Sequence, residues 1–307
     1  MKRFLLTLAL AAYSLMGAAQ TPQDEVSLTD MTFVRQSFIR NFYNLRKVVS
    51  QINMEGTNLQ LELSANLILE NSLATPTLKQ TGRTLNIAAT EGDVNSIIRV
   101  GAFHPYFTYE VSIADLDNNE QAGIAFYPNS GQGKVIYIYY QNGKVISKSL
   151  DNSEEKVLAE KDVKPAPVTK LRVQYTGVRF HVFSLYDDGS ADLLYSVTND
   201  MRAVESCITH SFGVYADLKK GSDVTLHKAE ALLTCGTGQA DSQIIQYSDG
   251  SPYIKDGRLY LCLTTRGFER IFDSYQGIYS IDLASYEVRL EGVLLFPITS
   301  ILFLHQP

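Results

Sequence analysis

The 307-residue sequence predicts an all-β protein built on an antiparallel β-sandwich, and three observations support this. Between residues 58 and 234, apolar and polar side chains alternate with a period of two, which is typical of half-buried strands. Short clusters of Gly, Asn, Asp and Ser separate the alternating segments, and no helical pattern lies between them. The pair Asn142-Gly143 stands between two β-rich runs and predicts a type I′ hairpin, and residues 187–190 predict another tight turn.

The expected strands share this alternation and follow one another through short turns. They lie within residues 58–69, 84–90, 96–103, 106–116, 122–128, 134–150, 169–186, 191–198, 210–218 and 223–233. Consecutive short strands without crossover helices favour two packed antiparallel sheets over an α/β fold.

The N-terminal residues are expected to direct export. Residues 1–19 carry Lys2 and Arg3, then an apolar run, then small residues, which is the pattern of a signal peptide. The apolar run is shorter than the roughly 20 residues needed to span a bilayer. We therefore expect a secreted or periplasmic protein with no transmembrane segment after signal cleavage, although a membrane anchor was the alternative interpretation.

Residues 20–57 are expected to form a linker with a short helix. Apolar side chains recur there at steps of three and four, which places them on one helical face. The residues of this stripe are Val34, Phe38, Phe42, Leu45, Val49 and Ile52.

Composition argues against several classes of partner and site. The formal net charge is −6 and no Lys/Arg run exceeds two residues, so no basic surface for nucleic acid is expected. The dispersed histidines and Cys207, Cys235 and Cys262 lack metal-ligand spacing, and the cysteines are interpreted as small buried side chains. The sequence thus predicts neither a metal site nor a cofactor.

Two stretches carry a first family resemblance. Residues 169–197 and 210–232, with turns at residues 175–177 and 188–189, resemble the last strands of a concanavalin/laminin-G-like jelly roll. The resemblance implies a jelly-roll sandwich domain over residues 58–235.

The C-terminal residues carry a second resemblance. Residues 251–261 and 276–292 are similar to the first blade of five-bladed propeller glycoside hydrolases of the arabinanase/β-xylosidase group. This implies that residues 236–307 form an incomplete propeller blade and tail, and that the hydrolase-like part is truncated. The family places a catalytic Asp-Pro where this chain has Ser251, and the acids of later blades are missing. Hydrolysis is therefore not expected, no catalytic residue is assigned, and Asp249 is retained only as a substrate-binding candidate.

Sugar binding is the activity that the sequence favours. In the strand within residues 134–141, Tyr137 and Tyr139 point to one side, whereas Ile136 and Ile138 point to the other. If the isoleucines enter the core, the tyrosines line an outer face on which a pyranose could stack. We thus expect an exported protein that binds a polysaccharide or oligosaccharide; the alternative is a non-catalytic cell-surface sandwich for structural or protein contacts.

Overall fold

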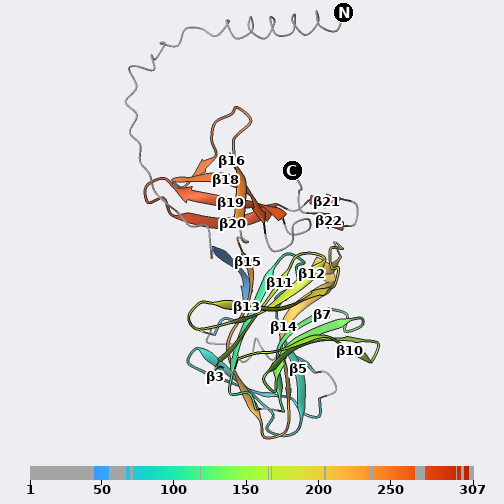
Figure 1. The fold of residues 1–307 in the computed structure, drawn as a ribbon. Helices are drawn as coiled ribbons and strands as arrows, with labels where there is room; N and C mark the ends of the chain where they lie inside the picture. The colour runs from blue at the N-terminus through green and yellow to red at the C-terminus, as the bar shows by residue number, and fades with distance from the viewer. Residues whose placement is uncertain are drawn as a thin grey trace, which may run out of the picture. The chain divides into compact units, whose positions relative to one another are not determined.

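The computed structural model describes residues 45–54, 67–69, 72–117, 119–164, 166, 168–203, 205–234, 238–266, 274–294, 296–298 and 301–303. Antiparallel strands dominate these residues, and the helix among them is the four-residue α3 (Ser206–Thr209). The all-β antiparallel sandwich expected from the sequence is confirmed (Figure 1). The proposed signal peptide lies outside the described residues.

One layer of the sandwich is an eight-stranded sheet. Its order is β13 (Ala191–Thr198), β12 (Arg179–Leu185), β11 (Val168–Tyr175), β6 (Thr108–Ala114), β15 (Asp223–Thr234), β4 (Thr84–Ala88) and β3 (Thr77–Thr81), and β1 (Arg46–Gln51) also pairs with β15. The other layer is a seven-stranded sheet. Its order is β10 (Glu154–Asp162), β9 (Lys144–Asp151), β8 (Val135–Gln141), β7 (Gln121–Pro128), β14 (His210–Leu218), β5 (Val94–Ala102) and β2 (Leu67–Leu69).

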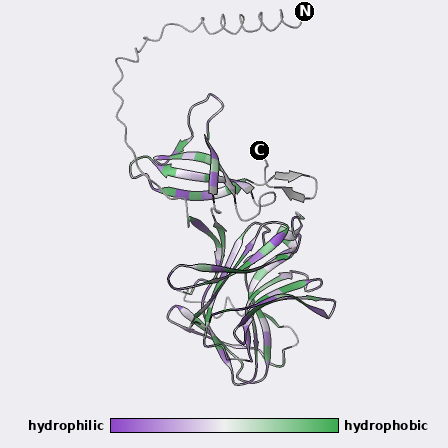
Figure 2. Cartoon of the chain, in the orientation of Figure 1, coloured by the Kyte–Doolittle hydropathy of each residue, from purple (hydrophilic) through white to green (hydrophobic). Residues whose placement is uncertain are grey.

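The main hydrophobic core lies between these two sheets. Alternate residues of the strands from both sheets enter it, including Leu85, Val111, Ile138, Val214 and Leu226, all at most 2% exposed. The hydropathy of the strands varies accordingly along their length (Figure 2). Period-two alternation therefore fixes the two inner faces, as in other sandwiches.

Four aromatic residues fill one part of this core. Phe103, Tyr109, Phe126 and Tyr175 pack with ring centroids 4.8–6.4 Å apart, mostly edge to face. The Tyr175 hydroxyl accepts a hydrogen bond of 3.0 Å from the side-chain amide of Asn199, which satisfies a buried polar atom.

The predicted hairpins have the expected geometry. Asn142 and Gly143, between β8 and β9, both have positive φ, 50° and 74°, as a type I′ turn requires. Gly189, between β12 and β13, has a φ of 83°, and Asp188 accepts hydrogen bonds from the backbone and side chain of Ser190.

The predicted N-terminal helix is wrong where it can be compared. Residues 46–51 form strand β1, which pairs antiparallel with residues 230–234 of β15, and the earlier part of the predicted helix lies outside the described residues. Residues 46–51 form a strand because they pair with one side of β15. The predicted helical pattern is not satisfied here, since Val49, one of its apolar residues, is 48% exposed.

Strands β10 and β3 were not predicted from the sequence. Strand β10 carries six acidic or basic residues in nine and is mostly exposed, so apolar alternation is absent from it. It forms because Asn152 and Ser153, with φ of 50° and 69°, reverse the chain and lay β10 against β9. A polar edge strand of this kind also discourages pairing with other chains.

A separate five-stranded sheet follows the sandwich in sequence. Its order is β16 (Gly238–Ile244), β18 (Arg258–Arg266), β19 (Ser274–Asp282) and β20 (Val288–Leu294), and β17 (Ile254–Lys255) pairs with β18. Leu261, Leu263, Tyr279 and Leu290 are buried together on one of its faces. A four-stranded meander is what a propeller blade would contain, but its interpretation as a blade stays a prediction.

The remaining strands β21 (Phe296–Ile298) and β22 (Ile301–Phe303) form a two-stranded ladder. Within the described parts of the chain, no helix has the length and apolar character needed to cross a membrane.

Candidate functional site

The outer face of the seven-stranded sheet holds both tyrosines singled out from the sequence. Ile136 and Ile138 of β8 enter the inter-sheet core, so Tyr137 and Tyr139 point to the opposite face. There they join Tyr127 of β7 and Tyr215 of β14. We call these four residues the tyrosine layer.

Small residues let the rings of the tyrosine layer lie down on the sheet. Strand β7, between β8 and β14, presents Gly123 and Ala125 on this face. The rings of Tyr137 and Tyr215 reach across it to a centroid distance of 4.6 Å, and Tyr139 lies 5.8 Å from Tyr215. The rings therefore cover one another, and Tyr137 and Tyr139 are only 3% and 4% exposed.

A lysine lies over these rings. The Lys148 ammonium of β9 is 5.7 Å from the centroid of Tyr137 and 6.0 Å from that of Tyr139. The Lys148 ammonium also forms an ion pair at 3.0 Å with Glu155 of β10, and the Glu155 side chain is 60% exposed. A cation held over the ring faces occupies the position that a stacked sugar would need.

Polar groups border the tyrosine layer. The Tyr215 hydroxyl donates to the side-chain carbonyl of Gln121 at 3.1 Å, and Gln141 lies within 3.4 Å of Gln121. Burial raises the pKa of the neighbouring Asp217, with Lys219 acting in the opposite direction. Burial also raises the pKa of Tyr139, so this hydroxyl remains protonated and can donate.

Asp249, the third candidate from the sequence, is not brought to this face. It lies in the turn before β17, outside the sandwich sheets, and accepts hydrogen bonds from the Ser251 backbone at 2.9 Å and the Ser251 hydroxyl at 2.6 Å. The Ser251 hydroxyl lowers the pKa of Asp249. Its carboxylate thus stabilises a tight turn, as Asp188 does with Ser190.

Three tyrosines near Asp249 also pack together. Tyr247, Tyr253 and Tyr260 pack edge to face with centroids 5.4 and 5.1 Å apart, and Tyr247 is 52% exposed. Their irregular spacing across a turn and two strands gave no periodic signal.

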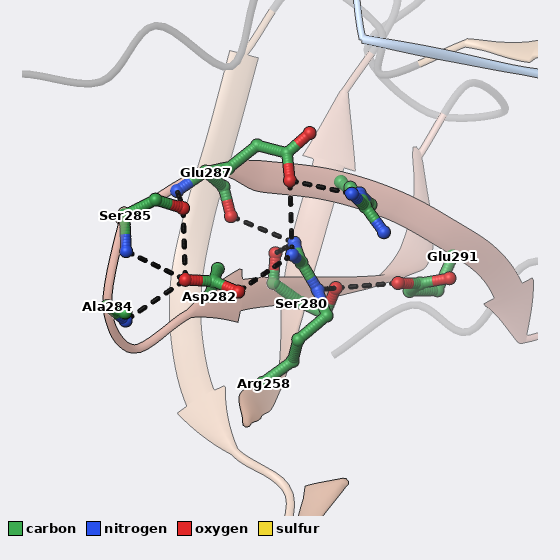
Figure 3. A network of polar contacts seen from close by, with 8 residues as sticks. Arg258, Ser280, Asp282, Ala284, Ser285, Glu287 and Glu291 are labelled. Atoms are coloured by element: carbon green, nitrogen blue, oxygen red, sulfur yellow. Dashed lines mark hydrogen bonds and ion pairs between the residues drawn. The ribbon is translucent and has the colours of Figure 1, made fainter. Parts of the chain in front are cut away.

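A buried arginine organises the polar side of the five-stranded sheet (Figure 3). Arg258 is 7% exposed and donates to the Ser280 hydroxyl at 2.7 Å, to the Glu287 carboxylate at 3.2 Å and to the backbone carbonyls of both residues. The Ser280 hydroxyl donates in turn to Glu291 at 2.6 Å. Arg258 thus bonds to Ser280 in β19 and to Glu287 just before β20, and these bonds link the two arms of the β19–β20 hairpin.

Two carboxylates at this network, Glu287 and Asp282, have a lowered pKa. The Arg289 guanidinium lowers the pKa of Glu287, and N–H donation from Ser285 lowers that of Asp282. A glycoside hydrolase needs one carboxyl with a raised pKa as its acid. Neither Glu287 nor Asp282 is such a carboxyl.

Two further carboxylates face each other on the outer side of the eight-stranded sheet. Glu110 of β6 is directly opposite Glu230 of β15, and both are at most 5% exposed. Lys228 bonds to Glu110 at 2.8 Å and also pairs with Glu230, and Arg172 approaches Glu110 to 2.6 Å. Burial raises the pKa of Glu110, but the two cations outweigh it and the net pKa is lowered. The pair therefore forms a ladder of carboxylates balanced by the neighbouring cations Lys228 and Arg172.

No metal-ligand cluster occurs among the residues that the structure describes. Burial lowers the pKa of His104 to about 4, so its imidazole is neutral near pH 7. Cys207 and Cys262 form no disulfide and are partly buried, which raises the pKa of both thiols. Cys235 lies outside the described residues.

The fold has been compared with known proteins. No family model matches the sequence, and no curated protein sequence matches it. Among solved structures, the chain is similar to the GH43 protein BlXynB from Bacillus licheniformis, with 14% identity over 54% of this chain and 39% of that chain and a TM-score of 0.40. It is similar to the carbohydrate binding module CBM66 from Bacillus subtilis, with 16% identity over 54% of this chain and 94% of that one (TM-score 0.38). A Bacillus subtilis protein of unknown function with a galectin-like fold shares 7% identity over 62% and 97% of the two chains (TM-score 0.44). These TM-scores are below 0.5, and the likenesses carry no inference about this chain.

Proposed function

We propose that this protein binds a neutral glycan on the outer face of the seven-stranded sheet. The observation that carries the proposal is the tyrosine layer, in which several aromatic rings lie on one sheet face beside amide and carboxylate side chains. A sugar presents both an apolar C–H face and hydroxyls, so it matches rings bordered by polar groups.

The cover over the rings is weak. Lys148, whose side chain is 15% exposed, contributes a cation–π contact of about 0.5–2 kcal/mol and an ion pair with the exposed Glu155 of about 0–1 kcal/mol. Moving Lys148 aside therefore costs about 1.4 kcal/mol, which reduces affinity about tenfold. Lys148 is the charged part of a cover to which Ile68, Ile146 and Leu150 also contribute.

The rival function is a structural or protein-contact sandwich without a sugar ligand. The near-complete burial of Tyr137 and Tyr139 favours it, because rings that bury one another stabilise the sheet without any ligand. The two functions differ in whether removing the Lys148 side chain creates a measurable change in sugar affinity.

Glycan binding is tested first with an array of plant and host polysaccharides and then by calorimetry on any ligand found. Alanine at Tyr137 or Tyr139 is a poor test, because truncating a buried aromatic ring costs about 3–5 kcal/mol and affects folding. Lys148→Ala is the sharper variant, and we expect it to strengthen neutral glycan binding about tenfold, since no cation must then be displaced.

Lys144→Ala is the matched control. Lys144 lies on the same strand and pairs with Glu160 at 2.8 Å, as Lys148 pairs with Glu155, but only Lys148 lies over Tyr137 and Tyr139. Equal effects of both substitutions, or none, would exclude the tyrosine layer as the binding face. A selective loss of affinity would retain the face and make Lys148 a sugar ligand.

The other features inferred from the sequence remain part of this proposal. Export rests on residues 1–19, and the blade interpretation rests on residues 251–261 and 276–292. The substrate-binding role of Asp249 stays a prediction that the proposed face does not use.

A further inference from the structure

One carboxylate beside the tyrosine layer accepts no hydrogen bond. Asp217 follows Tyr215 by two residues in β14, so both side chains are on the outer face of the seven-stranded sheet. Ala216 and Leu218, which alternate with them, enter the core. Asp217 is half-buried, and within the part of the chain that the structure describes no donor bonds to its carboxylate. This carboxylate is therefore available to a ligand.

Asp217 stands in the row of side chains next to the aromatic row. Tyr139 and Tyr215 lie on either side of Gly123 of β7 in one row. Two residues before Gly123, Gln121 is directly opposite Asp217. Successive rows on one face are roughly 6.8 Å apart, since an antiparallel strand rises about 3.4 Å per residue. A sugar ring stacked over Tyr139 and Tyr215 can therefore reach Asp217 with its hydroxyls.

The two cations that act on the Asp217 carboxylate are paired with other acids. The Lys219 ammonium pairs with Asp93 at 3.0 Å, and the Lys148 ammonium pairs with Glu155 at 3.0 Å. The charges of Lys219 and Lys148 lower the pKa of Asp217, but neither ammonium bonds to it. Asp217 thus has cations nearby and no hydrogen-bond donor of its own.

The other polar groups at this border are bonded to one another. The Tyr215 hydroxyl donates to the side-chain carbonyl of Gln121 at 3.1 Å. The Gln121 amide donates to Gln141 at 3.4 Å, and the Gln141 amide donates to the Asn119 carbonyl at 3.4 Å. A sugar that bonds to these groups must exchange existing bonds for new ones. Asp217 needs no such exchange, so a sugar hydroxyl bonds to it at less cost.

The Asp217 carboxylate lowers the stability of the folded protein. Burial raises the pKa of Asp217, and the charges of Glu120 and Asp93 act in the same direction. A raised pKa means that folding disfavours the ionised form, so the ionised carboxylate opposes folding at neutral pH. Groups that are costly where they stand are characteristic of functional sites.

We propose that Asp217 selects neutral sugars on the tyrosine layer by accepting hydrogen bonds from two adjacent sugar hydroxyls. A carboxylate accepts through both oxygens, and hydrogen bonds to a charged acceptor are stronger than those to a neutral one. The same charge repels the carboxylate of a uronic acid. The role of Asp217 rests on the proposed glycan-binding function and deepens it, because it names the group that recognises hydroxyls and the class of sugar that is excluded.

Calorimetry with the full chain tests this selection. The probes are trisaccharides of mannose, glucose and galactose, each measured beside its uronic acid counterpart. We expect Asp217→Asn to weaken neutral sugar binding about tenfold, because the charged acceptor is lost. The same variant should strengthen binding of the matching uronic acid, because the repulsion is lost, so the ratio of the two affinities falls by more than tenfold.

Asp162→Asn is the matched control. Asp162 is an exposed carboxylate on β10 of the same sheet, and its substitution removes the same charge. The affinity ratio should be unchanged in this variant. Urea unfolding gives a second readout: Asp217→Asn should unfold at the same or a higher urea concentration than the wild-type protein, since a carboxylate that opposes folding has been removed.

The contrary results separate Asp217 from the tyrosine layer. An affinity ratio that is unchanged in Asp217→Asn, or that falls equally in Asp162→Asn, would overturn the selection by Asp217. A parallel loss of both sugars together with lower stability would overturn it as well, because that pattern belongs to a structural residue. Neutral sugar binding that responds to Lys148→Ala but is the same in Asp217→Asn would refute Asp217 alone, whereas the absence of any neutral glycan binding would refute both.

Discussion

Adding one methyl group at Gly123 should disrupt the centre of the seven-stranded sheet. Gly123 on β7 is directly opposite Tyr139 on β8. A Cβ atom there would lie 2.2 Å from the Ile138 carbonyl oxygen and 2.7 Å from the Tyr139 Cα, whereas real Cβ contacts below 3.0 Å essentially do not occur. Both neighbours are backbone atoms, so β8 must move away by roughly 0.8 Å.

The expected cost follows from that movement. Overpacking a close-packed interior costs about 1–3 kcal/mol, and a clash with backbone atoms belongs at the upper end. We expect Gly123→Ala to lower the free energy of unfolding by about 3 kcal/mol and the Tm by about 6–12 °C. Since β8 carries Tyr137 and Tyr139 of the tyrosine layer, neutral glycan binding should weaken as well.

Thermal and urea unfolding, followed by circular dichroism, measure the effect. Gly292→Ala in β20 is the matched control, because a Cβ there meets no atom within 4 Å and the φ is not positive. That variant should be neutral or slightly more stable, by up to about 1 kcal/mol, because alanine restricts the unfolded chain. If Gly123→Ala unfolds at the same urea concentration as Gly292→Ala, the close packing of β7 against β8 is refuted.

Two further predictions concern buried polar groups. Arg258→Leu removes the donor to the carbonyls of Ser280 and Glu287, so it should lower the free energy of unfolding by about 3 kcal/mol in urea titrations, and an unchanged midpoint would contradict the role of this network. His104 has a pKa of about 4 in the folded protein against an ordinary 6.5, because burial disfavours its charged form. The unfolded chain therefore takes up the proton first, and stability should fall by up to about 3 kcal/mol as the pH drops from 6.5 to 4. The loss should be smaller in His104→Asn, and identical pH profiles for the two proteins would count against it.

Strand positions within the sandwich were largely predictable. The expected segments at residues 191–198 and 210–218 coincide with β13 and β14, because apolar alternation and turn residues mark both ends. Residues 46–51 and 154–162 were not identified as strands. Each is a mostly exposed strand held by pairing with a neighbour, β15 or β9, and such pairing leaves no apolar alternation in the strand itself.

The candidate site was only half predictable. Alternation in β8 placed Tyr137 and Tyr139 on the face opposite Ile136 and Ile138, and the structure has them there. It could not show that Tyr215, about 76 residues further along the chain, packs against them, since that contact depends on β14 lying next to β7.

The sequence by itself determined the alternation of side chains, the tight turns and hence an antiparallel sandwich, because these features depend on residues close together in the chain. Only the tertiary structure decided which strands are neighbours. Strand order buries the tyrosine rings under one another, places Lys148 above them and puts Asp217 in the next row, opposite Gln121. Those contacts join residues far apart in sequence, and local periodicity contains no information about such pairings.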